Sequence, residues 1–302
     1  MKTAFDRRGF LQSAGLAAAS SLVAEVRAGA PRPAEGMAPP KPRLLTACCA
    51  YSYGKYLEAG KMTMEDFILK AVDLEVVGVD MTAYWLKSKE PAYLLNLRHL
   101  AFKHGIPFSG AACGTEMCEP DAGKRAARVT EIEQWVDVAE LLGASHLRVF
   151  GGELPPGATV AQGEDWVVEV MKPACDYAAK KGVTLGIESH HGITSMASDI
   201  IEILHRVDSP YAGCNLDITH FPTDPYAQIE ALIPYTTMTH IRDHFDEPRP
   251  APIDLERVWQ MFAKAGYQGF MAAEYESEEE PATGVPKLVA KIKALCKKYS
   301  SV

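Results

Sequence analysis

Acidic and histidine side chains gather in four short segments in the second half of the chain. These segments are Glu188 to His191, Asp217 to His220, His240 to His244 and Glu274 to Glu276. A lone carboxylate at the end of a β-strand usually caps a helix or pairs with an arginine, but four such segments in succession indicate one shared site. Two glutamates, one aspartate and one histidine supply hard oxygen donors plus an imidazole, a mixture that suits Mn²⁺, Mg²⁺ or Co²⁺ better than Zn²⁺. We predict that one divalent metal ion, with Mn²⁺ the leading candidate, is held by Glu188, Asp217, His240 and Glu274.

A metal site of this kind would support chemistry next to a carbonyl group. A cation that chelates a carbonyl and a neighbouring hydroxyl makes the adjacent C–H bond acidic and stabilises the resulting enediolate. Glu188 and Glu274 are the expected catalytic residues, one removing the proton and the other returning it on the opposite face, which is epimerisation. Return to the neighbouring carbon gives aldose–ketose isomerisation, and loss of a β-substituent gives elimination. His220 and Arg242 are expected to bind and polarise substrate oxygens.

Two roles are open for each of several other side chains near the predicted site. His191 is expected to contact the substrate or the metal, although His190 and His191 are equally compatible with packing in a loop. Arg148 either binds substrate or pairs with an acid inside the fold, and the salt bridge is favoured. Tyr84 and Trp85 either stack on a sugar ring or pack against a neighbouring loop.

The order of β-rich and helix-periodic runs predicts how these residues are positioned. From Arg43 onwards, eight strand–helix pairs follow one another, which favours a single (β/α)₈ TIM barrel of the α/β class over a doubly wound sheet. Active sites of such barrels lie at the carboxyl ends of the strands. The expected strands are 44–49, 76–81, 106–112, 146–150, 184–189, 212–217, 236–241 and 269–274. The expected helices lie near 63–74, 90–104, 123–142, 164–181, 196–207, 225–232, 254–265 and 284–298, and Gly105, Gly143, Gly182 and Gly266 are expected to end four of them.

The residues at the ends of the later strands carry a family resemblance. The D-x-x-H pattern from Asp217 to His220 and the H-x-x-D pattern from His240 to Asp243 resemble the sugar phosphate isomerase/epimerase family of xylose-isomerase-like barrels. The resemblance implies the metal ligands named above. It also implies a function among ketose 3-epimerases, hydroxypyruvate isomerases, inosose dehydratases and an abasic-site endonuclease branch. Many of the epimerases carry another glutamate shortly after the strand-five ligand, where this chain has His190 and His191.

Composition narrows the classes of function. The 302 residues include 31 basic and 39 acidic side chains, so the charge of −8 is opposite to that expected for a protein that neutralises nucleic-acid phosphates. With 47% apolar residues, a folded enzyme-sized domain is expected. The chain lacks a phosphate-binding glycine loop typical of nucleotide sites. We therefore expect a small-molecule carbohydrate as the partner, no nucleic acid, and possible assembly into a homo-oligomer.

The N-terminus resembles an export signal. Arg7 and Arg8 precede Phe10 and Leu11, as in twin-arginine signals, and the apolar stretch that follows is too short for a stable membrane span. We expect residues 1–30 to be a signal peptide, 31–42 a proline-rich tether and 43–302 the catalytic barrel, with a periplasmic or other extracytoplasmic location. A chance arginine pair in an N-terminal helix is the alternative reading.

The expected function is therefore a divalent-metal-dependent sugar isomerase or epimerase that acts through an enediolate on a keto-sugar or related carbohydrate. A metal-dependent lyase or dehydratase acting on a 3-keto-sugar or glycoside is the first alternative. A non-catalytic carbohydrate-binding barrel is an alternative of another class. The endonuclease branch is disfavoured by the acidic charge, the export signal and the lack of its extra histidine ligands.

Overall fold

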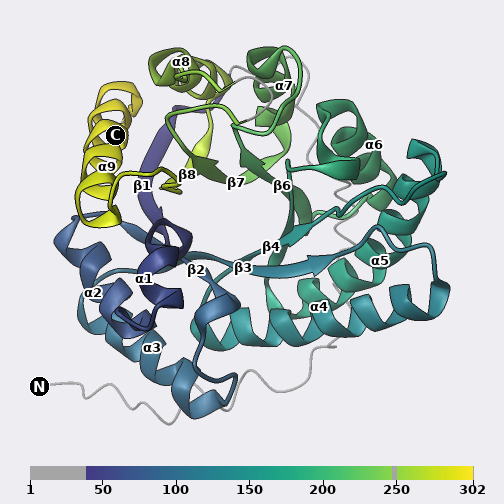
Figure 1. Cartoon of the computed structure of the whole chain (residues 1–302), viewed down its shortest axis with the longest axis horizontal. Coiled ribbons are helices and arrows are strands. Elements are labelled where there is room, and N and C mark those ends of the chain that lie inside the picture. The colour runs from purple at the N-terminus through teal and green to yellow at the C-terminus, as the bar shows by residue number, and fades with distance from the viewer. Residues whose placement is uncertain (1–38, 247–249, 302) are drawn as a thin grey trace, which may run out of the picture.

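The computed structural model describes residues 39–246 and 250–301 of the chain. In these residues, eight parallel strands close into a barrel in chain order, and the helices surround it (Figure 1). The last strand returns to the first through a six-residue register that runs from Arg43 beside Gln268 to Cys48 beside Ala273. The strands are β1 Arg43–Cys49, β2 Gly78–Thr82, β3 Phe108–Glu116, β4 His146–Phe150, β5 Thr184–Glu188, β6 Ala212–Asp217, β7 Thr236–Ile241 and β8 Gln268–Ala273. The predicted (β/α)₈ barrel is confirmed, while the predicted signal (1–30) and most of the tether (31–38) lie outside the described residues.

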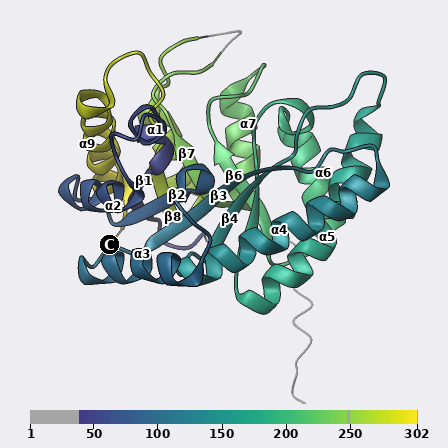
Figure 2. The same ribbon diagram turned by 60° about the horizontal axis from the view of Figure 1, so that its bottom comes forward.

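The helices follow the strands and cover the outside of the barrel (Figure 2). Each predicted helix is present, and a short helix, α1, follows β1 in addition. The predicted cap glycines all have positive φ angles, and Gly182, at φ 68°, ends α5 in the left-handed conformation that a side chain would oppose. The helices are α1 Gly54–Glu58, α2 Met64–Asp73, α3 Pro91–Lys103, α4 Ala122–Leu142, α5 Val160–Lys181, α6 Ala197–Val207, α7 Pro225–Leu232, α8 Leu255–Ala265 and α9 Pro281–Tyr299.

Strand boundaries differ from the prediction in two places that bear on the site. Strand β3 runs on through Glu116 instead of ending at Ala112, because its register on β4 shifts between these residues and Glu116 pairs with Phe150. A shift of this kind leaves no trace in hydrophobic periodicity. Strand β8 ends at Ala273, so Glu274 is the first residue after the strand, although its amide still donates to the Ile241 carbonyl of β7 at 3.0 Å.

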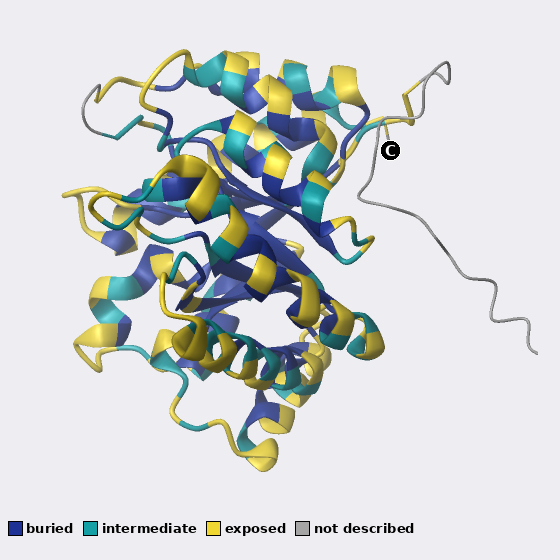
Figure 3. Cartoon of the chain, turned by 90° about the vertical axis from the view of Figure 1, so that its right-hand side faces the viewer, coloured by how far each residue is buried: buried dark blue, intermediate teal, exposed yellow. Residues whose placement is uncertain are grey.

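Most apolar side chains lie between the strands and the surrounding helices. Phe67, Trp259 and Phe262 are fully buried there, and Figure 3 shows helices whose outward faces are exposed around buried strands. Inside the barrel, a small apolar cluster is formed by Ala47, Met238 and Ala272. The core between the two layers supplies the burial that stabilises the fold, which leaves the carboxyl end of the barrel free to hold polar groups.

The interior of the barrel also holds a buried histidine, His146 of β4. Neither of its ring nitrogens has a hydrogen-bond partner among the described residues. Burial lowers the pKa of His146 to about 4. Asp80 and Glu188 act in the opposite direction, whereas His240 and Arg148 lower the pKa further. A Cβ atom at Gly186 would lie 2.2 Å from the Nε2 atom of His146, so glycine is required opposite this ring.

The described residues include all seven cysteines, and each is a free thiol. Among the helices in the part of the chain that the structure describes, none has the length and apolar character needed to cross a membrane.

Candidate active site at the carboxyl end of the barrel

A cavity of about 600 Å³ opens at the carboxyl end of the barrel, which is where the sequence predicts the active site. Strand register brings its residues together, because Asp217 of β6 lies beside His240 of β7, and Glu188 of β5 lies beside Asn215 of β6. Six of the seven predicted site residues line the cavity: Glu188, His191, Asp217, His220, Arg242 and Glu274. The seventh, His240, is fully buried beside it.

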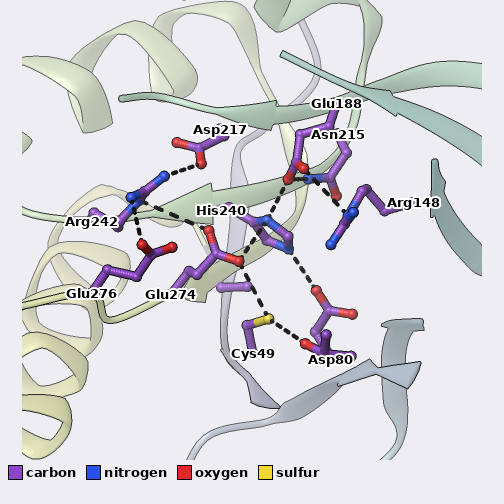
Figure 4. A network of polar contacts seen from close by, with 12 residues as sticks. Cys49, Asp80, Arg148, Glu188, Asn215, Asp217, His240, Arg242, Glu274 and Glu276 are labelled. Carbon is purple, nitrogen blue, oxygen red and sulfur yellow. Dashed lines mark hydrogen bonds and ion pairs between the residues drawn. The ribbon is translucent and has the colours of Figure 1, made fainter. Parts of the chain in front are cut away.

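His240 lies at the centre of the polar network (Figure 4). Its Nδ1 atom is 2.7 Å from Oε1 of Glu188 and 3.2 Å from Oε1 of Glu274, but it makes no hydrogen bond of good geometry to either. On the other side of the ring, Nε2 forms a 2.8 Å hydrogen bond with Oδ2 of Asp80. When Asp80 accepts the Nε2 proton, the lone pair of Nδ1 points at two carboxylates. With a neutral ring, that arrangement is unfavourable unless a cation lies among the three groups. Burial opposes a charge on His240, but Glu274 and Glu188 hold its pKa well above the usual value, so in the absence of metal a proton on Nδ1 takes the place of the cation.

The donor atoms fit a divalent metal ion. Glu188, Asp217 and His240 each offer a ligand atom, and these atoms lie within 4.8 Å of one another. Glu274 approaches the same Nδ1 atom of His240 as Glu188 does. Asp80 on Nε2 completes the carboxylate–histidine arrangement that orients imidazole ligands in metal proteins. Three of the four predicted ligands thus converge as a metal site requires, and Glu274 reaches the same His240 from a second group that includes Cys49.

Asp217 is held firmly in this cluster. Its Oδ1 atom accepts hydrogen bonds from the amide and hydroxyl of Thr219, at 2.9 and 2.7 Å. Its Oδ2 atom accepts a 2.8 Å bond from Nη2 of Arg242. Burial opposes the charge, but Arg242 and His220 hold the pKa of Asp217 well below its usual value. Because each carboxylate oxygen has two lone pairs, Arg242 and a metal ion can share Asp217.

The two predicted catalytic glutamates lie in different electrostatic surroundings. Burial raises the pKa of Glu274 to about 7, in spite of His240 and Arg242 nearby. Burial acts in the same direction on Glu188, but Arg148 and His240 outweigh it and lower the pKa of Glu188 to about 2. Arg148 forms the expected salt bridge within the barrel, with its Nε atom 3.4 Å from Oε2 of Glu188. In the absence of metal, Glu188 is thus the stronger and Glu274 the weaker acid of the two.

Three histidines meet on the β5–β6 side of the cavity. The ring centroids of His190, His191 and His220 are 4.2 to 4.6 Å apart in pairs. His190 also packs against Phe150, with centroids 4.8 Å apart, and burial lowers its pKa to about 4. His190 is therefore a packed ring that lines the cavity, while His191 is the more exposed of the pair.

Arg242, which is predicted to bind substrate, also lies close to three carboxylates of the site. Its guanidinium lies 2.8 Å from Asp217, 3.9 Å from Glu274 and 3.4 Å from Glu276 (Figure 4). The side chain of Glu276 is 41% exposed, but it also lines the cavity and pairs with Arg242. This pairing could not be predicted, because Glu276 stands in an acidic run that is typical of a surface loop. The side chain of His244, by contrast, is 63% exposed and does not line the cavity.

Sequence reasoning did not assign a role to Asp80 or Asn215. Asp80 lies beside Cys49 in the β1–β2 register, and its side chain is hydrogen-bonded to the ring of His240. Asn215 donates a 2.9 Å hydrogen bond from Nδ2 to Oε1 of Glu188. The position of each residue in the sequence could have indicated that it belongs to the site. Asp80 stands at the end of the second strand, and Asn215 is two residues before Asp217, on the same face of its strand.

The comparisons with known proteins agree with this architecture. A family model described as xylose isomerase-like TIM barrel matches residues 69–295. A Mus musculus protein named as a hydroxypyruvate isomerase is 22% identical over 180 residues, which are 54% of this chain and 65% of that protein, just under two thirds of its length.

Two solved structures share the fold across most of the chain. D-allulose 3-epimerase from Methylomonas sp. superimposes with a TM-score of 0.66 at 19% identity, covering 87% of this chain and 100% of that one. The IOLI protein, solved with a bound zinc atom, superimposes with a TM-score of 0.67 at 17% identity, covering 85% of this chain and 100% of that one. The family model spans more than half of the sequence, and the closed barrel carries its polar residues at the expected end. The chain belongs to the xylose isomerase-like TIM barrel family.

Proposed function

We propose that this protein is a divalent-metal-dependent sugar isomerase or epimerase that acts through an enediolate on a keto-sugar or a related carbohydrate. The observation that carries the proposal is the position of His240. One ring nitrogen faces two glutamates without a hydrogen bond, and the other is held by Asp80. This arrangement is what a metal-ligating histidine needs on both sides of its ring.

Glu188, Asp217, His240 and Glu274 would hold the metal ion. The bound ion supplies Lewis acidity, which makes the C–H bond next to a substrate carbonyl acidic and stabilises the enediolate. The donor set favours Mn²⁺, Mg²⁺ or Co²⁺, and the zinc atom in the IOLI structure supports Zn²⁺ as a further candidate.

Glu188 and Glu274 are the proposed proton-transfer residues. They come from β5 and from the end of β8, and both reach the neighbourhood of His240 from different sides of the barrel. A substrate carbon between them would lose its proton to one carboxylate and regain a proton from the other. Delivery to the opposite face of the same carbon gives the epimer, and delivery to the neighbouring carbon gives the isomer. His220 and Arg242 lie on the Asp217 side of the cavity, where they are proposed to hydrogen-bond substrate oxygens.

The charges around the cavity support a neutral sugar over a sugar phosphate. Five carboxylates line it, from Glu188, Asp217, Asp246, Glu274 and Glu276, whereas its two arginines are already paired with acids. A phosphate would need unpaired arginine or lysine donors. Hydroxyl groups can instead bond to carboxylates and arginines at once.

The test combines metal analysis with hydrogen exchange. Protein loaded with Mn²⁺ and incubated with D-fructose, D-allulose or their 3-keto analogues in D₂O should place deuterium on the carbon next to the carbonyl, which NMR detects. Glu274→Gln should slow the exchange about 10²- to 10⁴-fold, and Glu202→Gln, on the exposed surface of α6, should leave it unchanged. Release of a β-substituent would identify the lyase alternative. Binding of sugars without exchange would contradict the enzyme proposal in favour of a non-catalytic carbohydrate-binding barrel.

The location of the protein is a separate proposal that rests on the sequence. Arg7 and Arg8 before Phe10 and Leu11 support export through the twin-arginine route to the periplasm or another extracytoplasmic space. An exported enzyme meets free sugars and glycosides more often than sugar phosphates, which agrees with the acidic lining of the cavity.

A further inference from the structure

A second cavity adjoins the candidate active site. Its volume is about 450 Å³, and four residues line both cavities: Tyr51, Arg242, Asp246 and Glu276. The far wall comes from helix α1 and from the segment between β8 and α9. At about 600 Å³, the first cavity already lies within the range of complete small-molecule sites, roughly 300 to 1,000 Å³. A single sugar ring at the metal ligands would therefore leave the second cavity unfilled.

Aromatic rings lead from one cavity into the other. The centroid of Trp85 is 5.7 Å from that of Tyr51 and 5.8 Å from that of Tyr84. Tyr51 and Tyr84 line the first cavity, and Tyr51 and Trp85 line the second. Tyr51 and Tyr84 are 37% and 44% exposed, although large aromatic groups gain free energy when covered. The Tyr51–Trp85–Tyr84 cluster thus offers open ring surface at the point where the two cavities meet.

The Trp85 ring is positioned before any ligand binds. A Cβ atom at Gly54 would lie 3.1 Å from Cη2 of Trp85, so the backbone of helix α1 supports the ring from behind. The hydroxyl of Tyr84 accepts a 3.2 Å hydrogen bond from Nη1 of Arg148. Rings held in this way lose little conformational entropy when a ligand packs against them.

The remaining walls of the second cavity are hydrophilic and acidic. Its acids are Glu58, Asp246, Glu276 and Glu278, against Lys55 and Arg242 as its bases. Lys55 donates a 2.9 Å hydrogen bond to the carbonyl of Ser277, and Arg242 is paired with Asp246 and Glu276. An anionic group would be repelled here, whereas a ring with hydroxyl groups on its edge and C–H groups on its face matches both kinds of wall.

We propose that the substrate is a glycoside, with its keto-sugar unit at the metal ligands and an uncharged glycosyl unit in the second cavity against Trp85 and Tyr51. This inference rests on the proposed function for the placement of the keto-sugar unit. The border residues Arg242 and Glu276 then lie at the linkage between the two units, where they can bond to oxygens of both. The substrate class is thereby narrowed from free ketoses to neutral ketose-containing glycosides.

The experiment compares single and glycosylated ketoses on the Mn²⁺-loaded full chain by calorimetry. The probes are D-fructose and three disaccharides that contain it with a free keto unit, namely lactulose, isomaltulose and turanose. At least one disaccharide should bind about tenfold or more tightly than D-fructose. Trp85→Ala should weaken binding of that disaccharide about three- to tenfold, as expected for loss of an aromatic contact, and leave D-fructose binding unchanged. Trp85→Phe should restore part of the loss.

Trp135→Ala is the matched control, because Trp135 is a half-buried tryptophan of α4 that packs against Lys89 and lines neither cavity. The proposal is overturned if no disaccharide binds more tightly than D-fructose, or if Trp85→Ala leaves the advantage of the disaccharide undiminished. Deuterium exchange separates this proposal from the previous one. Exchange in D-fructose without any preference for disaccharides removes only the glycoside proposal. Tight, Trp85-dependent disaccharide binding without exchange removes only the proposed reaction.

Discussion

The clearest perturbation of the metal site is a change at Asp80, a residue that would not touch the metal. Asp80 is 1% exposed, and its Oδ2 atom lies 2.8 Å from Nε2 of His240. Asp80→Asn keeps an oxygen that can accept the Nε2 proton but removes the negative charge, whereas Asp80→Ala removes the bond itself. Loss of such outer partners commonly costs about ten- to hundredfold in metal affinity, or about 1.4 to 2.7 kcal/mol. We expect Asp80→Asn near the lower value and Asp80→Ala near the upper one.

Calorimetric titration of the metal-free protein with Mn²⁺ measures this effect directly, without an assay of activity. The ¹⁵N shifts of His240 report which ring nitrogen carries the proton, and in Asp80→Ala the fixed tautomer should be lost. Asp176→Asn is the control, because Asp176 is exposed on α5, away from the site. If both Asp80 variants bind Mn²⁺ as tightly as the wild type, then His240 is not oriented by Asp80 and the reading of the site is wrong.

Metal removal by chelation should lower the melting temperature and added Mn²⁺ should restore it, because a ligand that binds only the folded state stabilises it; an unchanged curve after verified removal would count against the site. Metal-saturated Glu188→Gln and Glu274→Gln should each lose about 10²- to 10⁴-fold in substrate C–H exchange, and near wild-type rates in both would refute the two-glutamate mechanism. Replacing Arg7 and Arg8 by lysine should retain the protein in the cytoplasm on cell fractionation, and normal export of this variant would exclude the twin-arginine route. Lowering the pH from 6.5 towards 4 should destabilise the wild type by up to about 3 kcal/mol more than His146→Leu in urea titrations, because the buried ring stays neutral while the unfolded chain takes up a proton; parallel pH profiles would contradict this.

The barrel and the four converging ligands could be predicted because both follow from local pattern and simple geometry. Strand–helix alternation with glycines at the helix ends identifies the fold, and parallel strands in a closed barrel bring their carboxyl ends to one mouth. Once Glu188, Asp217, His240 and Glu274 are assigned to four successive strand ends, their proximity follows without any knowledge of side-chain conformation.

The pairing of side chains across the barrel could not be predicted in the same way. Asp80 and His240 are 160 residues apart and come from β2 and β7, which are not neighbours in the barrel. Their contact depends on the barrel's width and on which side chains fill its interior. The pairing of Glu276 with Arg242 likewise depends on the path of the segment after β8, which has no periodicity to read.

The same contacts change the argument for a metal ion. From sequence alone, convergence of Glu188, Asp217 and Glu274 implies repulsion that a cation must relieve. The structure places Arg148 beside Glu188, and Arg242 beside Asp217 and Glu274, so much of that repulsion is offset by the chain itself. Surplus negative charge is therefore weak support for the ion. The stronger support is directional, because Asp80 holds Nε2 of His240 while Nδ1 faces two carboxylates without a hydrogen bond of good geometry. A metal ion among these three groups would take the position that a proton on Nδ1 occupies in its absence.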